Sequence, residues 1–457
     1  MKKNNSPWLH QLDPNREHTK LTQDLTTDVV VVGAGIAGIA TTFFILKNTD
    51  KKVVLLEKYK LGHGATGHNA GQVVSYFERG FASLAKEFGI TLAGQGQHAV
   101  EQAWELLDEM YTDAHLDIPF SRFVGHAGLT SYEQVLWHLE DSLMRKQAGL
   151  QTEPMRVCAE EDFIETIPEK YQGLYIVAPA KEVLATLETK QQRFVAVMSS
   201  QKGCVNSALL CQEVLAYLLA TYPERFALYE HTPVHKIILH EHDALLDADT
   251  HTLQAARVVL CTNGFADLHI INENGLEVDA KYHHLLSGKI GYMSGYLEQL
   301  NKTPTAISYY TDPKPSVDNS YYYLTRRSWE YEKNTEHNLI SIGGPDMDIE
   351  ESHTYSHEDE YPEIHEQKID AFVRSVYDTE PNKKIDYLFT WHGLMGYTKN
   401  KVRLIGAEPQ NPILLYNLGC NGVGILPSLY GGRRIARIIA GESLEKTIFD
   451  VPQKSSE

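Results

Sequence analysis

A glycine-rich turn at residues 33–38, with the sequence GAGIAG, constrains the fold of this chain more than any other feature. The apolar residues 29–32 before it predict a buried parallel strand that leads the backbone into a tight turn. Glycines at the first, third and sixth positions let a pyrophosphate lie against the N-terminus of the following helix, where free N–H groups and the helix dipole favour negative charge. The turn therefore indicates a dinucleotide-binding strand–turn–helix unit.

A second predicted strand, residues 53–56, supports this interpretation. It leads to Glu57, 19 residues after Gly38, close to the roughly 20 residues expected between the glycines and the acidic residue of such a site. The Glu57 carboxylate can accept hydrogen bonds from the adenosine ribose hydroxyls. Because strand, glycines, helix and acidic strand end occur in the right order, we predict a dinucleotide site rather than a chance glycine-rich turn.

The net charge, the apolar runs and the cysteines indicate which partners and which cellular location to expect. A formal net charge of −18 over 457 residues would repel nucleic acid and anionic membrane surfaces. Residues 1–27, which we interpret as an N-terminal extension, lack the apolar core of a signal peptide, and no apolar run approaches the roughly 20 residues of a membrane helix. The five cysteines include no CxxC pair, which indicates reduced thiols. We therefore expect a cytoplasmic protein without membrane insertion and without a nucleic-acid partner.

The order of predicted elements indicates one nucleotide-binding domain assembled from distant segments. Residues 419–424 form a second glycine-rich loop before a predicted helix, whereas residues 285–345 have the tyrosines, β-branched residues and turn signals of antiparallel sheet. We predict an α/β fold in which a Rossmann-like domain built from discontinuous segments carries an inserted antiparallel-sheet substrate domain. The predicted segments are 28–90, 200–265 and 385–450 for the Rossmann-like domain, and 91–199 and 266–384 for the substrate domain.

Four segments carry a resemblance to a known family. They are residues 28–38 with Glu57 and Lys58, the small-residue loop 64–72, the strand and turn 258–264, and a C-terminal stretch that contains 391–393 and 419–424. In this order they resemble the FAD-dependent oxidoreductases that include D-amino-acid oxidase, glycine oxidase and sarcosine oxidase, over about residues 25–445. The resemblance implies that the Rossmann-like domain is an FAD-binding domain.

The matched segments also imply which residues contact FAD. Small side chains allow a cofactor to approach the backbone closely. A helix after residues 419–424 that points at the flavin would stabilise the reduced, anionic form. The implied set is Gly33, Gly35, Ile36, Ala37, Gly38, Glu57, Lys58, Ala65, Thr66, Gly67, His68, Asn69, Ala70, Gly71, Gln72, Val234, Thr262, Asn263, Gly264, Gly422, Val423 and Gly424.

The chemistry implied by the resemblance is oxidation of a C–N bond in a small amine or amino acid. Hydride passes from the carbon beside the nitrogen to flavin N5, water hydrolyses the imine, and oxygen or another acceptor reoxidises the flavin. His68 stands where some relatives carry a histidine bonded covalently to the flavin. A histidine that only hydrogen-bonds the cofactor is the alternative, and Asn69 differs from the alanine expected in the covalent relatives.

Three residues are candidate catalytic groups. Arg326 resembles the strand arginine of glycine oxidase and could hold a substrate carboxylate with its bidentate fork, although a strand-end surface charge is the alternative. Lys289 could promote oxygen reduction, and His392 could face the flavin; a surface lysine and a packed core histidine are the alternatives. Met395 stands where several amino-acid oxidases have a second arginine, so an amine substrate is favoured at least as much as an amino acid.

The remaining patterns leave alternatives open. Tyrosines at 309–310 and 321–323 could line a substrate pocket or belong to a plain sheet. A tRNA-modification-type oxidase domain is one alternative function, disfavoured by the acidic composition, and a non-catalytic flavin-binding protein is another. We predict no metal site, because acidic, histidine-containing runs are usually solvated; the run considered contains His353, His357, Glu358, Asp359 and His365.

Overall fold

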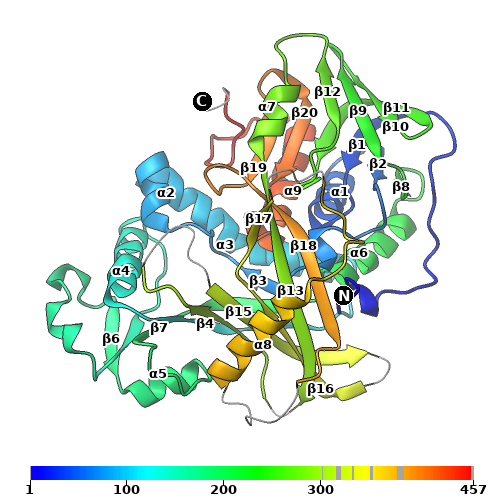
Figure 1. The fold of residues 1–457 in the computed structure, drawn as a ribbon. Coiled ribbons are helices and arrows are strands. Elements are labelled where there is room, and N and C mark those ends of the chain that lie inside the picture. Colours follow the sequence, from blue (N-terminus) through cyan, green and yellow to red (C-terminus); the bar gives the residue numbers. More distant parts are fainter. Residues whose placement is uncertain are drawn as a thin grey trace.

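The computed structural model describes residues 2–300, 302–314, 321–331, 334–349, 354–377 and 385–453. Two large mixed sheets dominate the fold and lie in separate halves of the molecule, the first in the upper right and the second in the lower part of Figure 1. This arrangement confirms the predicted fold class: a Rossmann-like domain built from discontinuous segments, together with a second domain that is mainly antiparallel sheet.

The first sheet has a parallel centre, in which β11, β1, β2 and β8 are neighbours. On β1 the four valines 29–32 are all buried, as expected for a parallel strand covered on both faces. Its strands run in the order β12 (His269–Asn272), β9 (Val234–Leu239), β10 (Ala244–Ala248), β11 (His251–Leu260), β1 (Leu25–Val32), β2 (Val53–Leu56) and β8 (Phe226–Tyr229), with β20 (Asn411–Leu418) beside β11 and β19 (Leu404–Glu408) beside β20.

The second sheet is mainly antiparallel, and its long strand β13 lies towards the right-hand edge of the sheet in Figure 1, beside β18. Its strands run in the order β17 (Met347–Ile349), β13 (Ser287–Gln299), β16 (Asn334–Gly343), β15 (Tyr321–Tyr331), β14 (Thr305–Tyr310), β4 (Phe120–Leu129), β7 (Ala196–Val205), β5 (Met155–Cys158) and β6 (Tyr175–Ala178), with β18 (Phe389–Tyr397) beside β13 and β3 (Gln72–Val74) beside β7.

Three strands join a different sheet from the one that the sequence segments predict. Strands β3 and β18 lie within predicted FAD-binding segments 28–90 and 385–450, yet they pair with β7 and β13 of the second sheet. Strand β12 lies within predicted substrate segment 266–384, yet it pairs with β9 of the first sheet. The three differences have the same cause: the chain crosses between the sheets within a segment, and no composition change marks the crossing.

Helices cover both sheets, and α1 packs closely on α9 in the first domain. A β-carbon at Gly432 would lie 2.8 Å from the backbone of Ala40, so glycine is required for this approach. The helices are α1 (Ile36–Asn48), α2 (Phe81–Phe88), α3 (Ile90–Asp113), α4 (Tyr132–Gln147), α5 (Ala180–Thr186), α6 (Ser207–Thr221), α7 (Asp279–Leu285), α8 (Glu363–Tyr377) and α9 (Ile425–Ile439).

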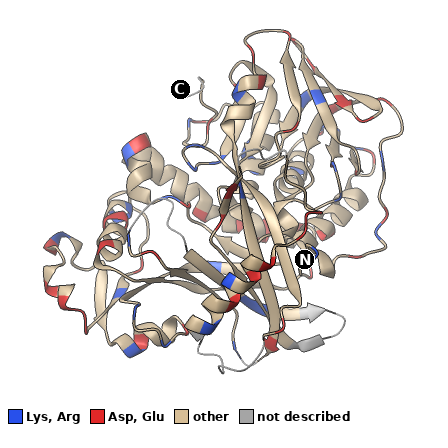
Figure 2. Ribbon diagram, in the orientation of Figure 1, with Lys and Arg blue, Asp and Glu red and all other residues tan. Residues whose placement is uncertain are grey.

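Charged residues lie mainly on the outer helices and connecting segments, whereas the two sheets are largely free of them in Figure 2. None of the helices in the described ranges combines the length and the apolar character needed to cross a bilayer.

The N-terminal extension packs against the body of the protein. Trp8 is fully buried in a small core that includes Trp391, and the two indole rings meet edge to face at 6.4 Å. The Trp8 Nε1–H donates to the carbonyl oxygen of Asn69 at 2.5 Å, and the Ser6 hydroxyl donates to that of Gly67. Residues 6–8 therefore hold loop 64–72 against the second sheet.

Candidate functional site

A long cavity connects the two sheets, and we call it the central cavity. Its wall begins at the β1–α1 turn and continues along loops that follow β2 and β11. It ends on residues of β13, β14, β15 and β18 in the second sheet. The loop before α9 closes one side. The carboxyl ends of the parallel strands β1, β2 and β11 open into this cavity, which is where α/β sheets bind their ligands.

The β1–α1 turn presents open backbone donors to the central cavity. Gly35 is the N-cap of α1 and has no side chain to cap the helix, and Gly35, Ile36 and Ala37 line the cavity. Gly33 has a φ of 102°, and a β-carbon on Gly38 would lie only 1.8 Å from the Gly33 carbonyl oxygen. Both positions therefore require glycine, and the turn forms a cradle suited to a pyrophosphate.

A second helix begins at the same cavity without a side-chain cap. Gly424 is the N-cap of α9, and Gly422, Val423 and Ile425 line the wall beside it. Gly422 has a φ of 80°, and a β-carbon there would lie 2.8 Å from Glu78 Cγ. Two helix N-termini thus direct their positive dipole ends at one cavity, an arrangement that suits a ligand with two separate negative parts.

Glu57 lines the part of the cavity beside β2, where the sequence predicts adenosine, and we call this part the adenosine end. Its Oε2 accepts the N–H of Ala34 at 2.7 Å and its Oε1 accepts the N–H of Tyr59 at 2.9 Å, so the carboxylate links β2 to the glycine turn. Burial raises the pKa of Glu57, although these two hydrogen bonds oppose the rise. Neighbouring Lys58 pairs with Asp267 at 2.5 Å, also on the cavity wall.

Loop 64–72 forms the next part of the wall. Thr66 Oγ1 accepts the N–H of Ile36 at 2.9 Å and so ties the loop to the start of α1. Asn69 Nδ2 donates to Ser207 Oγ at 2.7 Å. The His68 Nδ1 atom lies 2.9 Å from the carbonyl oxygen of Gly64, and burial lowers the pKa of His68 to about 3. A neutral imidazole therefore stands in the cavity wall.

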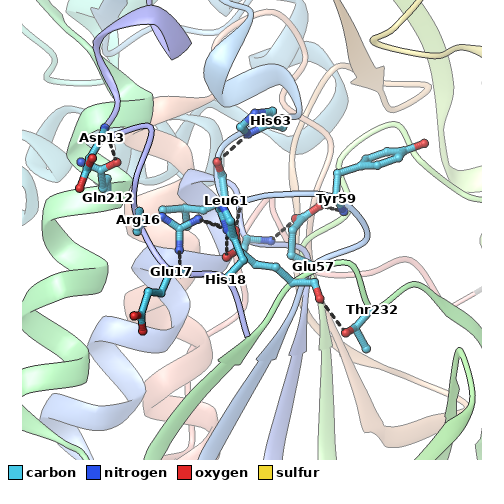
Figure 3. A network of polar contacts seen from close by, with 12 residues as sticks. Asp13, Arg16, Glu17, His18, Glu57, Tyr59, Leu61, His63, Gln212 and Thr232 are labelled. Carbon is cyan, nitrogen blue, oxygen red and sulfur yellow. Dashed lines mark hydrogen bonds and ion pairs between the residues drawn. The ribbon is translucent and has the colours of Figure 1, made fainter. Parts of the chain in front are cut away.

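The N-terminal extension also holds the segment after β2, as Figure 3 shows. Glu230 is 1% exposed and accepts hydrogen bonds from Arg16 Nη2 at 2.5 Å and from the N–H of Leu61 at 2.6 Å. His18 Nδ1 lies 2.7 Å from its other oxygen. These contacts hold the Glu230 pKa below its usual range in spite of burial. The extension is thus anchored beside the adenosine end of the cavity.

The structure brings most of the implied FAD residues to the wall of the central cavity. The exceptions support the wall from behind: Gly38 packs on Gly33, Gly67 on Leu9 and Gly62, Gly71 on Trp8, and Gly264 on Gly396. Those on the wall are Gly33, Gly35, Ile36, Ala37, Glu57, Lys58, Ala65, Thr66, His68, Asn69, Ala70, Gln72, Val234, Thr262, Asn263, Gly422, Val423 and Gly424.

Arg326 does not reach the cavity. It is 2% exposed, and its Nη1 and Nη2 donate to the two carboxylate oxygens of Glu188 at 2.7 and 2.6 Å. Its Nε donates to the carbonyl oxygen of Thr303 at 2.9 Å. The fork that a substrate carboxylate would use is therefore occupied by a carboxylate of this chain, at a site removed from the cavity wall.

His392 and Lys289 also lie outside the wall. His392 is buried, with Nε2 2.9 Å from the carbonyl oxygen of Asp359 and Nδ1 3.1 Å from the Tyr355 hydroxyl, and burial lowers its pKa. Lys289 pairs with the exposed Asp348 at 3.1 Å. Both residues lie on strands, β13 and β18, of which other residues line the cavity. Their places in the sequence therefore resemble those of residues in the site.

Sequence reasoning missed the acidic part of the wall. Glu78 follows β3 and Asp346 precedes β17, so neither belongs to a motif, and only folding brings them together. The tyrosine runs did carry a signal, because alternate residues of a strand face opposite sides. On β15, Tyr321 and Tyr323 line the cavity, whereas Tyr322 stacks on Phe372 at 4.1 Å on the other face.

The histidine-rich run near residue 357 does not come together as a set of ligands among the described residues, and His353 lies outside them. Another group does: His269, Asp279 and His283 place one ligand atom each within 4.8 Å of one another. It lies at the edge of the first sheet, where Asp279 Oδ1 already accepts the N–H of Ile270 at 2.6 Å. We assign it no role in the cavity.

The fold and the central cavity together define a dinucleotide-binding α/β protein with a second, sheet-based domain. The DAO family, described as FAD dependent oxidoreductase, matches residues 28–438. This chain belongs to that family, and it is an FAD-dependent oxidoreductase with FAD as its cofactor, as the sequence predicts.

Relatives known by sequence match only part of the chain. γ-Glutamylputrescine oxidoreductase of Escherichia coli (strain K12) is 29% identical over 100 residues, which is 22% of this chain and 23% of that protein. The probable oxidoreductase OrdL of Haemophilus influenzae is 33% identical over 89 residues, 20% of each chain. The match therefore spans less than a quarter of either relative.

Solved structures match nearly the whole fold. Glycine oxidase from Geobacillus kaustophilus has a TM-score of 0.66 at 18% identity, with 94% of this chain and 99% of that chain covered. L-Proline dehydrogenase from P. horikoshii has a TM-score of 0.64 at 14% identity, with 92% and 95% covered. At these identities the likeness establishes the fold alone.

Proposed function

We propose that this protein oxidises a C–N bond of a small amine or amino acid, using FAD bound in the central cavity. The observation that carries the proposal is the meeting of two helix N-termini, those of α1 and α9, at one cavity that continues onto the tyrosine-lined face of the second sheet. One part of such a cavity binds a dinucleotide, and the other part is free to admit a small substrate.

The residues on the wall suit an FAD molecule laid along the cavity. Glu57 would accept hydrogen bonds from the adenosine ribose, and the open N–H groups at the start of α1 would hold the pyrophosphate. The N-terminus of α9 would stabilise negative charge on the flavin ring through its dipole. His68, held neutral, would contact the flavin as an uncharged imidazole.

Bound FAD supplies the hydride acceptor, its N5 atom, for a C–H bond beside the substrate nitrogen. The chain itself orients the substrate and shields it from water: Tyr321, Tyr323 and Met395 form an aromatic and apolar wall at the second sheet. Water then hydrolyses the product imine to a carbonyl compound and an amine. Oxygen or another acceptor reoxidises the flavin, and we propose no acceptor-binding residue.

The names of three similar proteins refer to nitrogen-containing compounds. Glycine oxidase and L-proline dehydrogenase name amino acids, and γ-glutamylputrescine oxidoreductase names an amine conjugate. These names support a C–N substrate without selecting one.

The test is anaerobic mixing of the holoenzyme with a panel of amines and amino acids, followed by the visible absorbance of the flavin. We expect at least one member of the panel to bleach the flavin, and the carbonyl product to appear in equal amount. tert-Butylamine is the matched control, because its carbon beside nitrogen carries no hydrogen and cannot donate hydride. If dithionite bleaches the flavin but no amine or amino acid does, the protein is a flavin-binding protein without this activity.

A further inference from the structure

The end of the central cavity at the second sheet carries two carboxylates. Glu78 and Asp346 both line the wall, together with Tyr321, Tyr323 and Tyr397. Tyr321 donates its hydroxyl hydrogen to Glu78 Oε1 at 2.8 Å, and the Tyr397 hydroxyl lies 3.5 Å from Asp346 Oδ2. We call this set of five residues the acidic end.

The acidic end lies directly beside the loop that precedes α9. A β-carbon on Gly422 would be 2.8 Å from Glu78 Cγ and 2.9 Å from the Tyr397 hydroxyl. On the opposite side, a β-carbon on Gly291 would be 3.4 Å from Asp346 Oδ1 and 3.6 Å from the Tyr323 hydroxyl. The two carboxylates thus face the part of the cavity where the proposed function requires the substrate.

The two cationic side chains among the described wall residues, Lys58 and Arg403, are engaged by groups other than Glu78 and Asp346. Among the described wall residues, Lys58 pairs with Asp267 at the adenosine end, and the Arg403 guanidinium donates to Asn417 Oδ1 at 2.6 Å and to the Asn417 carbonyl oxygen at 2.8 Å. The wall histidines, His63 and His68, have pKa values lowered by burial.

Lysines do lie near the acidic end, but behind its wall. Lys202 is buried over the Tyr76 ring at 5.7 Å, and Lys289 lies over the Tyr397 ring at 5.3 Å while it pairs with Asp348. Neither lines the cavity. The charges of Lys202 and Lys401 lower the pKa of Glu78, and that of Lys289 lowers the pKa of Asp346, but burial outweighs them: it raises the pKa of Glu78 and, together with repulsion from Glu78, raises the pKa of Asp346 to about 7.

A pair of carboxylates that line a cavity beside tyrosine rings suits a cation. Carboxylate oxygens accept charge-assisted N–H donors, and aromatic faces attract an ammonium group. The same surroundings repel the carboxylate of an α-amino acid, and the guanidinium of Arg326, which could have bound that carboxylate, is engaged by Glu188 outside the cavity.

We propose that the acidic end binds the ammonium group of the substrate through Glu78 and Asp346, so that the substrate class is a cationic alkylamine without a carboxylate beside its nitrogen. This inference rests on the proposed function, because it assigns the substrate of that same site. Hydride leaves only from the carbon beside a neutral amine, so the bound ammonium group passes one proton to a carboxylate of the acidic end before the C–H bond breaks. The two residues otherwise bind and orient the nitrogen.

The test uses two probes of the same shape and opposite charge, tert-butylammonium and pivalate, on the oxidised holoenzyme. Neither can donate hydride from a carbon beside nitrogen, so binding is measured without turnover, as a change in the visible spectrum of the bound flavin. We expect tert-butylammonium to bind and pivalate to bind at least about tenfold more weakly, since a charge-assisted hydrogen bond is worth about 1.5–3 kcal/mol.

Substitutions of the two carboxylates test whether the cation binds at the acidic end. Asp346→Asn and Glu78→Gln should each weaken tert-butylammonium binding about tenfold or more while FAD stays bound. Asp348→Asn is the matched control: Asp348 is two residues away, its side chain is 84% exposed, and it does not line the cavity, so binding should stay within about twofold of the unsubstituted protein.

The possible outcomes separate the two proposals. Tighter binding of pivalate, binding of neither probe, or unchanged tert-butylammonium binding in both carboxylate variants overturns the ammonium site. If in that case amino acids still bleach the flavin, the proposed function stands without it. Conversely, tight tert-butylammonium binding without bleaching by any amine keeps the site and refutes the proposed function. If a variant does not fold, the comparison of the two probes on the unsubstituted protein still decides.

Discussion

Substitution of Trp8 tests the claim that the N-terminal extension orders the FAD loop. Trp8 is fully buried, packs on Trp391 and Gly71, and donates its Nε1–H to the carbonyl oxygen of Asn69. Trp8→Ala removes a buried tryptophan side chain, which costs about 3–5 kcal/mol in protein cores. Since loop 64–72 then lacks its support, FAD itself must order the loop, and part of this energy appears as weaker FAD binding.

The expected loss of affinity can be bracketed with two variants. Trp8→Phe keeps an aromatic ring but loses the hydrogen bond, worth about 1 kcal/mol, and part of the contact with Gly71, so the Kd for FAD should rise at least about fivefold. Trp8→Ala should raise it at least about tenfold, and up to about a hundredfold if some 3 kcal/mol is expressed in binding. The assay is fluorescence titration of the apoprotein with FAD.

Trp104→Ala is the matched control for this experiment. Trp104 is 8% exposed, stacks with Phe120 at 6.1 Å and does not line the central cavity. It should lower Tm as Trp8→Ala does while the Kd for FAD stays unchanged. If Trp8→Ala also lowers Tm and leaves the Kd for FAD unchanged, the extension stabilises the protein without ordering the FAD loop, and this reasoning is refuted.

Three further substitutions test other parts of the structure. Gly38→Ala places a methyl group 1.8 Å from the Gly33 carbonyl oxygen, so FAD affinity should fall at least about tenfold; an unchanged FAD titration would contradict the cradle. Lys281→Met leaves the fully buried Glu408 without the ammonium at 2.7 Å, and urea titration should show a loss of about 3–5 kcal/mol with an unchanged flavin spectrum. The raised pKa of Asp346, about 7, means that the folded protein keeps a proton which the unfolded chain releases from about pH 4 upward. The contribution of this carboxyl to the stability of the apoprotein should therefore fall between about pH 4 and pH 7, and the difference in stability between Asp346→Asn and the unsubstituted protein should change with pH in urea titrations; a difference independent of pH would show that the carboxyl does not keep its proton.

The dinucleotide part of the site could be predicted from sequence because its determinants are local. The turn 33–38, the loop 64–72 and the loop 419–424 each place backbone groups within a few residues, and glycines mark where a side chain would collide. The position of Glu57 beside the glycine turn follows from the lengths of the helix and the strand that separate them. Geometry that is fixed within a strand–turn–helix unit needs no knowledge of the rest of the fold.

The substrate end could not be predicted in the same way, because it is assembled from distant strands. Glu78 and Asp346 lie 268 residues apart and meet only when β3 and β13–β17 form one sheet. Arg326 is instead predicted to be in the site, because its position on the strand resembles that of the arginine in glycine oxidase, but it lies outside. Its partner Glu188 comes from a distant segment that the strand sequence does not reveal.

The visible spectrum of the purified protein decides whether the central cavity binds FAD. We predict a yellow protein with the absorbance bands of a flavin, equimolar FAD per chain after release, and loss of those bands in the Gly38→Ala variant. A colourless protein that cannot be reconstituted by added FAD would contradict the assignment of the central cavity to this cofactor.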